Sequence, residues 1–118
     1  MATSTIKMDL TNLFGYRHWH DSDIYQSRIS SNQARWIKVG STVFVSGRFR
    51  TEQSLNAGSA IATGFPVPTG NTSVPLAGCA SSGATIVGFS INAQGSLCTL
   101  SALPNGTYYA VGGVYFTD

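Results

Sequence analysis

The clearest alternation of apolar and polar residues in this chain lies between residues 38 and 50. Val43, Val45 and Phe49 stand at odd positions, and mostly polar side chains occupy the even positions between them. A repeat of two residues is typical of a β-strand with one buried face. Phe44 interrupts the repeat by placing a large ring on the polar face. We therefore expect a central strand of an antiparallel sheet here.

Other strand-like segments follow, separated by glycine, proline and asparagine turn signals. Residues 92–95 end in Gly95, which suits the positive φ of a tight turn, so the flanking strands are predicted to form a hairpin. Pro66 and Pro68 exclude a central strand and indicate an edge or an extended connection. The predicted strands span residues 34–38, 42–50, 60–63, 74–78, 84–92, 96–101 and 107–117.

The last predicted strand, residues 107–117, is apolar on both faces. It places Tyr108, Ala110, Val114 and Phe116 on one side and Tyr109, Val111 and Tyr115 on the other. We expect one face to meet the domain core and the other to meet a second sheet or a neighbouring subunit.

Seven or eight short strands, without helical periodicity longer than one turn, predict an all-β fold. The expected architecture is an antiparallel β-sandwich or jelly-roll-like domain over residues 34–118. Residues 1–33 differ in character, because they hold most of the acidic residues and both histidines. We expect them to form an N-terminal neck or connector segment without a stable fold of its own.

The charged residues are few and unevenly placed. Only 10% of the 118 residues are charged, and all seven Lys and Arg residues precede Glu52. The segment 53–117 contains no charged residue. Because charged residues are depleted from subunit interfaces, this half predicts a chain that packs against copies of itself with closed symmetry. The alternative is a surface solvated by Ser, Thr and Asn alone.

Several function classes are disfavoured. A net charge of +2 from scattered basic residues does not predict nucleic-acid binding. No stretch has the pattern of a signal peptide or a membrane span, which predicts synthesis in a cytoplasm and no membrane insertion. Neither a G-x-S-x-G elbow nor a second carboxylate placed to work with Glu52 is present, so an enzyme is not expected. Cys79 and Cys98 are expected to be buried thiols, and no cofactor is implied.

Four stretches resemble, in the same order, the C-terminal tip domain of bacteriophage tail fibre and receptor-binding proteins. The first is an aromatic, basic, Val-Gly and then Val-x-Val-x-Gly hairpin, and the second is an apolar segment with two prolines. The third is an Asn/Gly hairpin, and the fourth is a closing aromatic strand. These stretches are residues 35–47, 62–68, 91–97 and 109–118.

The resemblance implies a homotrimeric β-sandwich tip of a virion tail fibre, made in the host cytoplasm and joined to an upstream fibre or baseplate segment. It implies non-catalytic binding of a bacterial surface polysaccharide or cell-wall glycan during adsorption. One alternative is a structural module that trimerises and caps a fibre. A glycan-degrading enzyme is a weaker alternative.

Aromatic rings that pack on sugar faces, and amides that bind hydroxyls, are the expected glycan contacts. The alternative for each ring is a place in the core or an interface. The candidates are Trp19, Tyr25, Trp36, Asn56, Asn71, Asn105, Tyr108 and Tyr109.

The triplet 18–20 contains His18 and His20, which lie on the same side of an extended segment. Three such pairs around a threefold axis would supply six nitrogen ligands to a metal ion. The alternative, which the single pair favours, is two exposed loop histidines beside Trp19.

Overall fold

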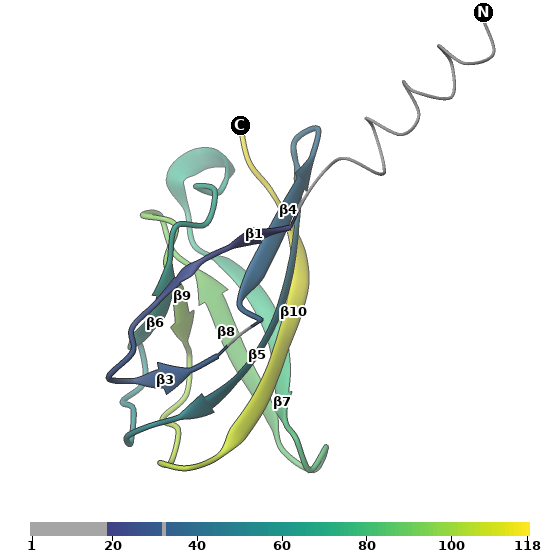
Figure 1. Ribbon diagram of the computed structural model, residues 1–118. Coiled ribbons are helices and arrows are strands. Elements are labelled where there is room, and N and C mark those ends of the chain that lie inside the picture. Colours follow the sequence, from purple (N-terminus) through teal and green to yellow (C-terminus); the bar gives the residue numbers. More distant parts are fainter. Residues whose placement is uncertain (1–18, 32) are drawn as a thin grey trace, which may run out of the picture.

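The computed structural model describes residues 19–31 and 33–118 (Figure 1). These residues form ten strands and one short 3-10 turn, and they contain no α-helix. The elements are β1 (His20–Asp21), β2 (Asp23–Ile24), β3 (Ile29–Ser30), β4 (Arg35–Val39), β5 (Thr42–Thr51), β6 (Ala60–Thr63), η1 (Thr69–Asn71), β7 (Val74–Ala80), β8 (Ile86–Ile91), β9 (Leu97–Thr99) and β10 (Tyr108–Phe116).

The all-β, antiparallel prediction is confirmed. Every strand expected from the sequence occurs within a few residues of its predicted bounds, and every pairing between strands is antiparallel. The predicted hairpin of β8 and β9 turns at residues 92–95, where Gly95 has a φ of 79°. The Asn92 side chain accepts hydrogen bonds from the N–H groups of Gln94 and Ser96, which fixes this turn.

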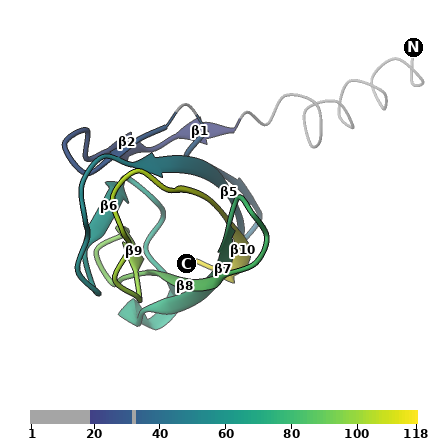
Figure 2. The ribbon, with the colours of Figure 1, turned by 90° about the horizontal axis from the view of Figure 1, so that it is seen from below.

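The strands form one nearly closed, barrel-like sheet, where two separate sheets of a sandwich were expected. Its path runs β1-β4-β5-β10-β7-β8-β9-β6-β2, and β3 pairs with β5 beside that path. The two ends of the path are consecutive in the chain. β1 pairs with β4 and β2 pairs with β6, so residues 20–24 bridge the gap that would divide the strands into two sheets (Figure 2).

Residues 20–30, which we assigned to a connector, instead take part in the sheet. Ile29 pairs with Thr51 and is 1% exposed. The Tyr25 N–H donates to the Ile61 carbonyl at 3.0 Å, and Arg28 Nη1 donates to the Ala60 carbonyl. The expected domain boundary at residue 33 therefore does not coincide with the edge of the sheet. Residues 1–18 of the expected neck lie outside the described residues.

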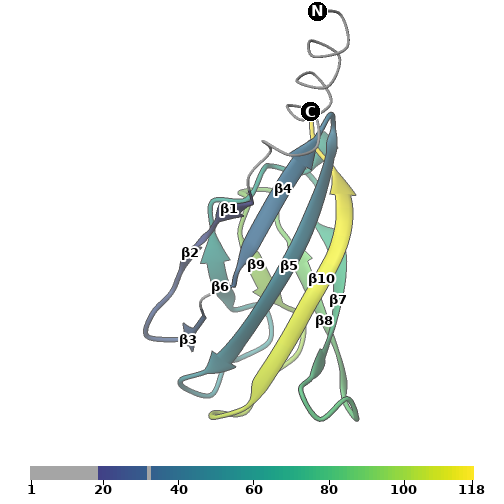
Figure 3. The same cartoon turned by 45° about the vertical axis from the view of Figure 1, so that its right-hand side comes forward.

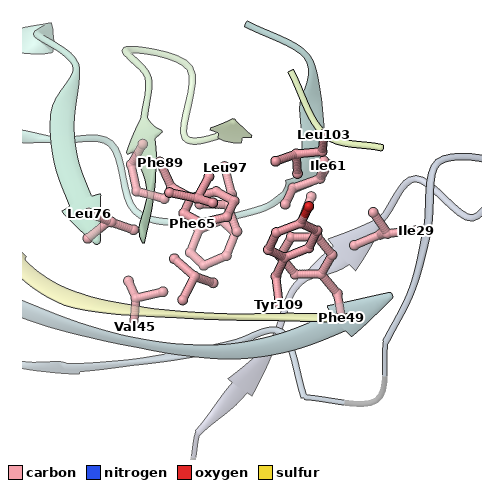
Figure 4. Packing of buried hydrophobic residues seen from close by; sticks show 14 of the residues in the cluster. Ile29, Val45, Phe49, Ile61, Phe65, Leu76, Phe89, Leu97, Leu103 and Tyr109 are labelled. Atoms are coloured by element: carbon pink, nitrogen blue, oxygen red, sulfur yellow. The ribbon is translucent and has the colours of Figure 1, made fainter. Parts of the chain in front are cut away.

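The interior of the barrel-like sheet holds one apolar core. Phe49 of β5 meets Phe89 of β8 edge to face, with ring centroids 5.8 Å apart, and stacks on Tyr109 of β10 at 5.5 Å. Phe49 and Tyr109 are cross-strand partners on neighbouring strands, Phe89 comes from another part of the sheet, and aliphatic side chains surround the three rings (Figure 4). Because each strand alternates, the odd residues of β5 and β10 point inward and the even residues point outward.

The outer face of β5 and β10 runs between two ends of the molecule. At one end Tyr108 pairs with Arg50, and at the other Phe116 pairs with Thr42. The loops 52–59, 81–85 and 100–107 gather at the Tyr108 end (Figure 3). This face carries Tyr108 together with Arg48 and Arg50.

Candidate functional site

Tyr108 is the most exposed of the candidate aromatic residues, with 57% of its surface accessible. It is the first residue of β10, and its alternation with the buried Tyr109 turns its side chain outward. The guanidinium carbon of Arg50, its partner in β5, lies 5.9 Å from the centre of the Tyr108 ring. This arrangement presents a ring to solvent beside a cation.

Two open grooves lie against Tyr108. The first has a volume of about 540 Å³ and includes Ser30, Ser31 and Arg50 in its lining. The second has a volume of about 460 Å³ and includes Cys79 and Ser81. Arg48, Phe49 and Tyr108 line both. The exposed ring therefore stands at a border between two hollows, each of a size typical for small ligands.

Hydrogen bonds fix the wall of the first groove. The Glu52 carboxylate accepts from the Ser30 hydroxyl at 2.8 Å and from Arg50 Nη1 at 2.9 Å. The Ser30 hydroxyl and then the Arg50 guanidinium hold the pKa of the Glu52 carboxyl below its usual value. Glu52 is therefore ionised near neutral pH, and it neutralises Arg50.

Arg48 is the second cation of this face. It pairs with Ala110 of β10, one outward position along β5 from Arg50, and its side chain is exposed. Its carbonyl accepts a hydrogen bond from the Ser31 hydroxyl. Within residues 19–31 and 33–118, the Arg48 guanidinium has neither a hydrogen bond nor an ion pair. Its donors are thus available to a ligand.

The other predicted aromatic contacts have different environments. Trp19 is 45% exposed and lines a hollow of about 160 Å³ with Arg35. Tyr25 is 39% exposed, and the Arg28 guanidinium carbon lies 4.7 Å from the centre of its ring. Neither residue lines the grooves beside Tyr108.

Trp36 and Tyr109 are poor candidates for ligand contacts. Trp36 is partly buried against the core and stacks on His20, with ring centroids 4.3 Å apart. Tyr109 is part of the lining of the second groove, but it is only 5% exposed and its ring stacks on Phe49. Both rings pack against other side chains of the domain, which agrees with the alternative that such aromatics belong to the core.

The three candidate asparagines are all exposed, but they are not together. Asn105 precedes Gly106, whose N–H donates to the Thr51 carbonyl next to Arg50. Asn56 follows Leu55, which forms a β-bridge with Leu103 in the neighbouring loop. Asn71 ends η1, whose preceding residue, Pro68, forms a β-bridge with Thr117 at the far end of β10 from Tyr108. The structure therefore does not bring the predicted asparagines into a single site.

Sequence reasoning missed Arg48, Arg50, Ser30 and Ser31 as site residues. The alternation of β5 places both arginines on one face, but the nearness of that face to Tyr108 depends on the pairing of β5 with β10. Ser30 ends β3, a strand of two residues that is too short to show a repeat, and Ser31 follows directly after it.

Large apolar side chains are exposed at the opposite end of the same face. Val114 pairs with Phe44, and Thr42 lies between Val39 and Phe116. We call Val39, Phe44, Val114 and Phe116 the outer apolar patch; they are 39%, 40%, 51% and 64% exposed. A hollow of about 300 Å³ beside Val114 and Phe116 is also lined by Val74 and Pro75. Exposed apolar surface of this kind is typical of a contact with another protein surface.

The threefold metal arrangement weighed above for His18 and His20 stays untested, because only one of the two histidines is among the described residues. His18 lies outside them, and His20 stacks on Trp36. No group of three or more His, Cys, Asp or Glu side chains within the described residues is arranged to hold a metal ion. Cys79 and Cys98 are free; Cys98 is buried and Cys79 is half-buried. In the same residues, no helix is long and apolar enough to cross a membrane.

A scan against protein-family models found no match to this chain, and a search of curated proteins found none either.

Proposed function

We propose that this chain is the tip domain of a phage-type tail fibre and that it binds a polysaccharide or cell-wall glycan on the host bacterium. The observation that carries the proposal is the exposed Tyr108 ring between two grooves lined with hydroxyl and guanidinium groups. A ring face packs on the apolar face of a sugar, while Ser and Arg side chains bind its hydroxyl groups. Adsorption of the virion to the cell is the role that this site would serve.

The proposed binding is non-catalytic. Glycoside hydrolysis usually needs two carboxyl groups, one of which has a raised pKa and donates a proton. Glu52 follows the end of β5, two residues after Arg50, which is the cross-strand partner of Tyr108. The pKa of the Glu52 carboxyl is lowered, whereas a proton donor needs a raised pKa. Its hydrogen bonds to Ser30 and Arg50 suit a residue that orders the groove wall.

The proposal includes a homotrimer, with the jelly-roll-like arrangement expected of such tips. Its support is the outer apolar patch together with the absence of charge between residues 53 and 117. The patch and the Tyr108 grooves lie at opposite ends of one face, so packing at the patch leaves the grooves accessible. The rival function, a purely structural module that trimerises and caps a fibre, is favoured by the same patch.

Cell binding separates the two functions. We expect the fluorescently labelled chain to bind particular bacterial strains saturably and Tyr108→Ala to weaken that binding about tenfold or more, since a buried Tyr anchor contributes about 2 kcal/mol. Tyr25→Ala is the matched control, because it removes an exposed Tyr outside the grooves. Equal binding by the wild type and Tyr108→Ala would refute this site. A trimer that labels no strain would favour the structural module.

A further inference from the structure

We propose that the ligand is an anionic glycan and that Arg48 binds its negative groups. This inference rests on the proposed glycan-binding function and adds the chemical class of the glycan. The feature that carries it is the exposed Arg48 guanidinium, which is shared by both grooves at the Tyr108 end and has no partner among the described residues.

The two cations of this face have different charge environments. Arg50 already forms an ion pair with Glu52 at 2.9 Å, so its charge is largely balanced within the protein. Arg35, further along the same face, pairs with Asp21 at 3.1 Å. Arg48 lies between them on the outer face, and no described acidic side chain pairs with it. The positive charge left over at this site is therefore that of Arg48.

The surroundings of Arg48 would not compete with an anionic ligand. No acidic residue of the described ranges is part of the lining of either groove, and the Glu52 carboxylate beside the first groove is already paired with Arg50. The walls that β7 and β10 contribute belong to the segment 53–117, which has no charged residue. A carboxylate or phosphate placed beside Arg48 thus meets no opposing negative charge from these walls.

The hydrogen-bonding geometry of the Arg48 guanidinium favours an anionic group over a neutral sugar as its partner. A neutral sugar would use single hydroxyl contacts, whereas a carboxylate or phosphate accepts two parallel N–H bonds from Arg. Since Arg48 lines the grooves on both sides of Tyr108, a sugar stacked on the ring has this cation beside it in either direction. The negative group would belong to the stacked sugar or to its neighbour in the chain.

The test uses the full chain and surface polysaccharide extracted from a strain that the labelled chain binds. Three forms of the polysaccharide are compared by titration: native, carboxyl-reduced, and treated with hydrofluoric acid to remove phosphodiesters. Carboxyl reduction keeps the sugar backbone and removes uronate charge, so the two treatments identify which anion is bound. We expect one of them to weaken binding about tenfold and wild-type binding to fall as salt rises from 50 to 500 mM.

Substitutions assign the effect to Arg48. Arg48→Gln is expected to reduce binding of the native polysaccharide about tenfold and to leave binding of the neutralised form unchanged. Arg48→Lys keeps the charge without the forked donors and is expected to bind with intermediate affinity. Lys38→Gln is the control for net charge, because Lys38 pairs with Val43, five residues along β5 from Arg48.

The outcomes distinguish this inference from the proposed function. If both treatments and Arg48→Gln leave binding unchanged while Tyr108→Ala abolishes it, the glycan is neutral and only the present inference is refuted. If Lys38→Gln weakens binding as much as Arg48→Gln, the effect is general electrostatics and the assignment to Arg48 is wrong. If the chain binds no strain, both proposals are refuted.

Discussion

Phe116→Ser tests whether the outer apolar patch is the contact between subunits. Phe116 is 64% exposed in the single chain, at the end of β10. A Phe side chain buries roughly 200 Å² when it is fully covered, so about 130 Å² is available for burial in an assembly. At roughly 25 cal/mol per Å², this area contributes about 3 kcal/mol per subunit.

The substitution should act on assembly and not on the fold. Because the Phe116 ring is mostly in water in the single chain, Ser is expected to change the free energy of unfolding of a subunit by about 0.5 kcal/mol or less. A trimer loses the contribution three times, and its dissociation constant has units of concentration squared. The concentration at half-dissociation should therefore rise about a thousandfold.

Sedimentation velocity over a range of protein concentrations measures this midpoint directly. Ile86→Ser is the matched control, since Ile86 is 86% exposed on β8, at the Tyr108 end, and lies outside the patch. We expect the control to assemble as the wild type does. An unchanged midpoint for Phe116→Ser, or dissociation of Ile86→Ser in its place, would show that the outer apolar patch is not the contact between subunits.

Three further predictions concern the fold. Phe89→Ala should reduce the free energy of unfolding by about 3–5 kcal/mol in guanidinium titrations, because the ring is fully buried against Phe49. Gly95→Ala should destabilise the chain by more than about 1 kcal/mol, because φ is 79° and the new Cβ would lie too close to the Phe65 carbonyl oxygen. Gly58→Ala is the control, because Gly58 has a φ of 88° but open space around it. The loss of stability in Gly58→Ala therefore measures backbone strain alone, and the additional loss in Gly95→Ala measures the steric clash. Burial raises the pKa of the Tyr115 phenol above that of the unfolded chain, which is about 10. The contribution of the neutral phenol to the free energy of unfolding is therefore fully present below about pH 10 and is lost progressively as the pH rises above that value. Tyr115→Phe should reduce that alkaline loss and, by removing the hydrogen bond to Pro66, cost about 1 kcal/mol at pH 7.

Local patterns in the sequence predicted most strands because they are long enough to show a repeat. β5 places Val43 and Val45 inward, as its alternation requires, and Gly95 closes the predicted hairpin. The alternation of β10 separated Tyr108 from Tyr109 but did not say which faced the core. Pairing with β5 decides that question, and it joins residues that are more than fifty positions apart.

The closing strands and the cations of the site could not be predicted in this way. β1, β2 and β3 have two residues each, which is too short for any periodicity, and their stability comes from distant partners such as Trp36, Ala62 and Thr51. Arg48 looked like one more polar position of a half-buried strand. Its significance depends on β10 placing Tyr108 and two grooves beside it.

Binding of the labelled chain to a panel of bacterial strains, compared with that of Tyr108→Ala and Tyr25→Ala at matched native mass, tests the central proposal most directly. We expect saturable labelling of particular strains that Tyr108→Ala weakens about tenfold and Tyr25→Ala leaves unchanged. Labelling that is indifferent to Tyr108, or absent from every strain while the chain is a folded trimer, would contradict a glycan-binding tip.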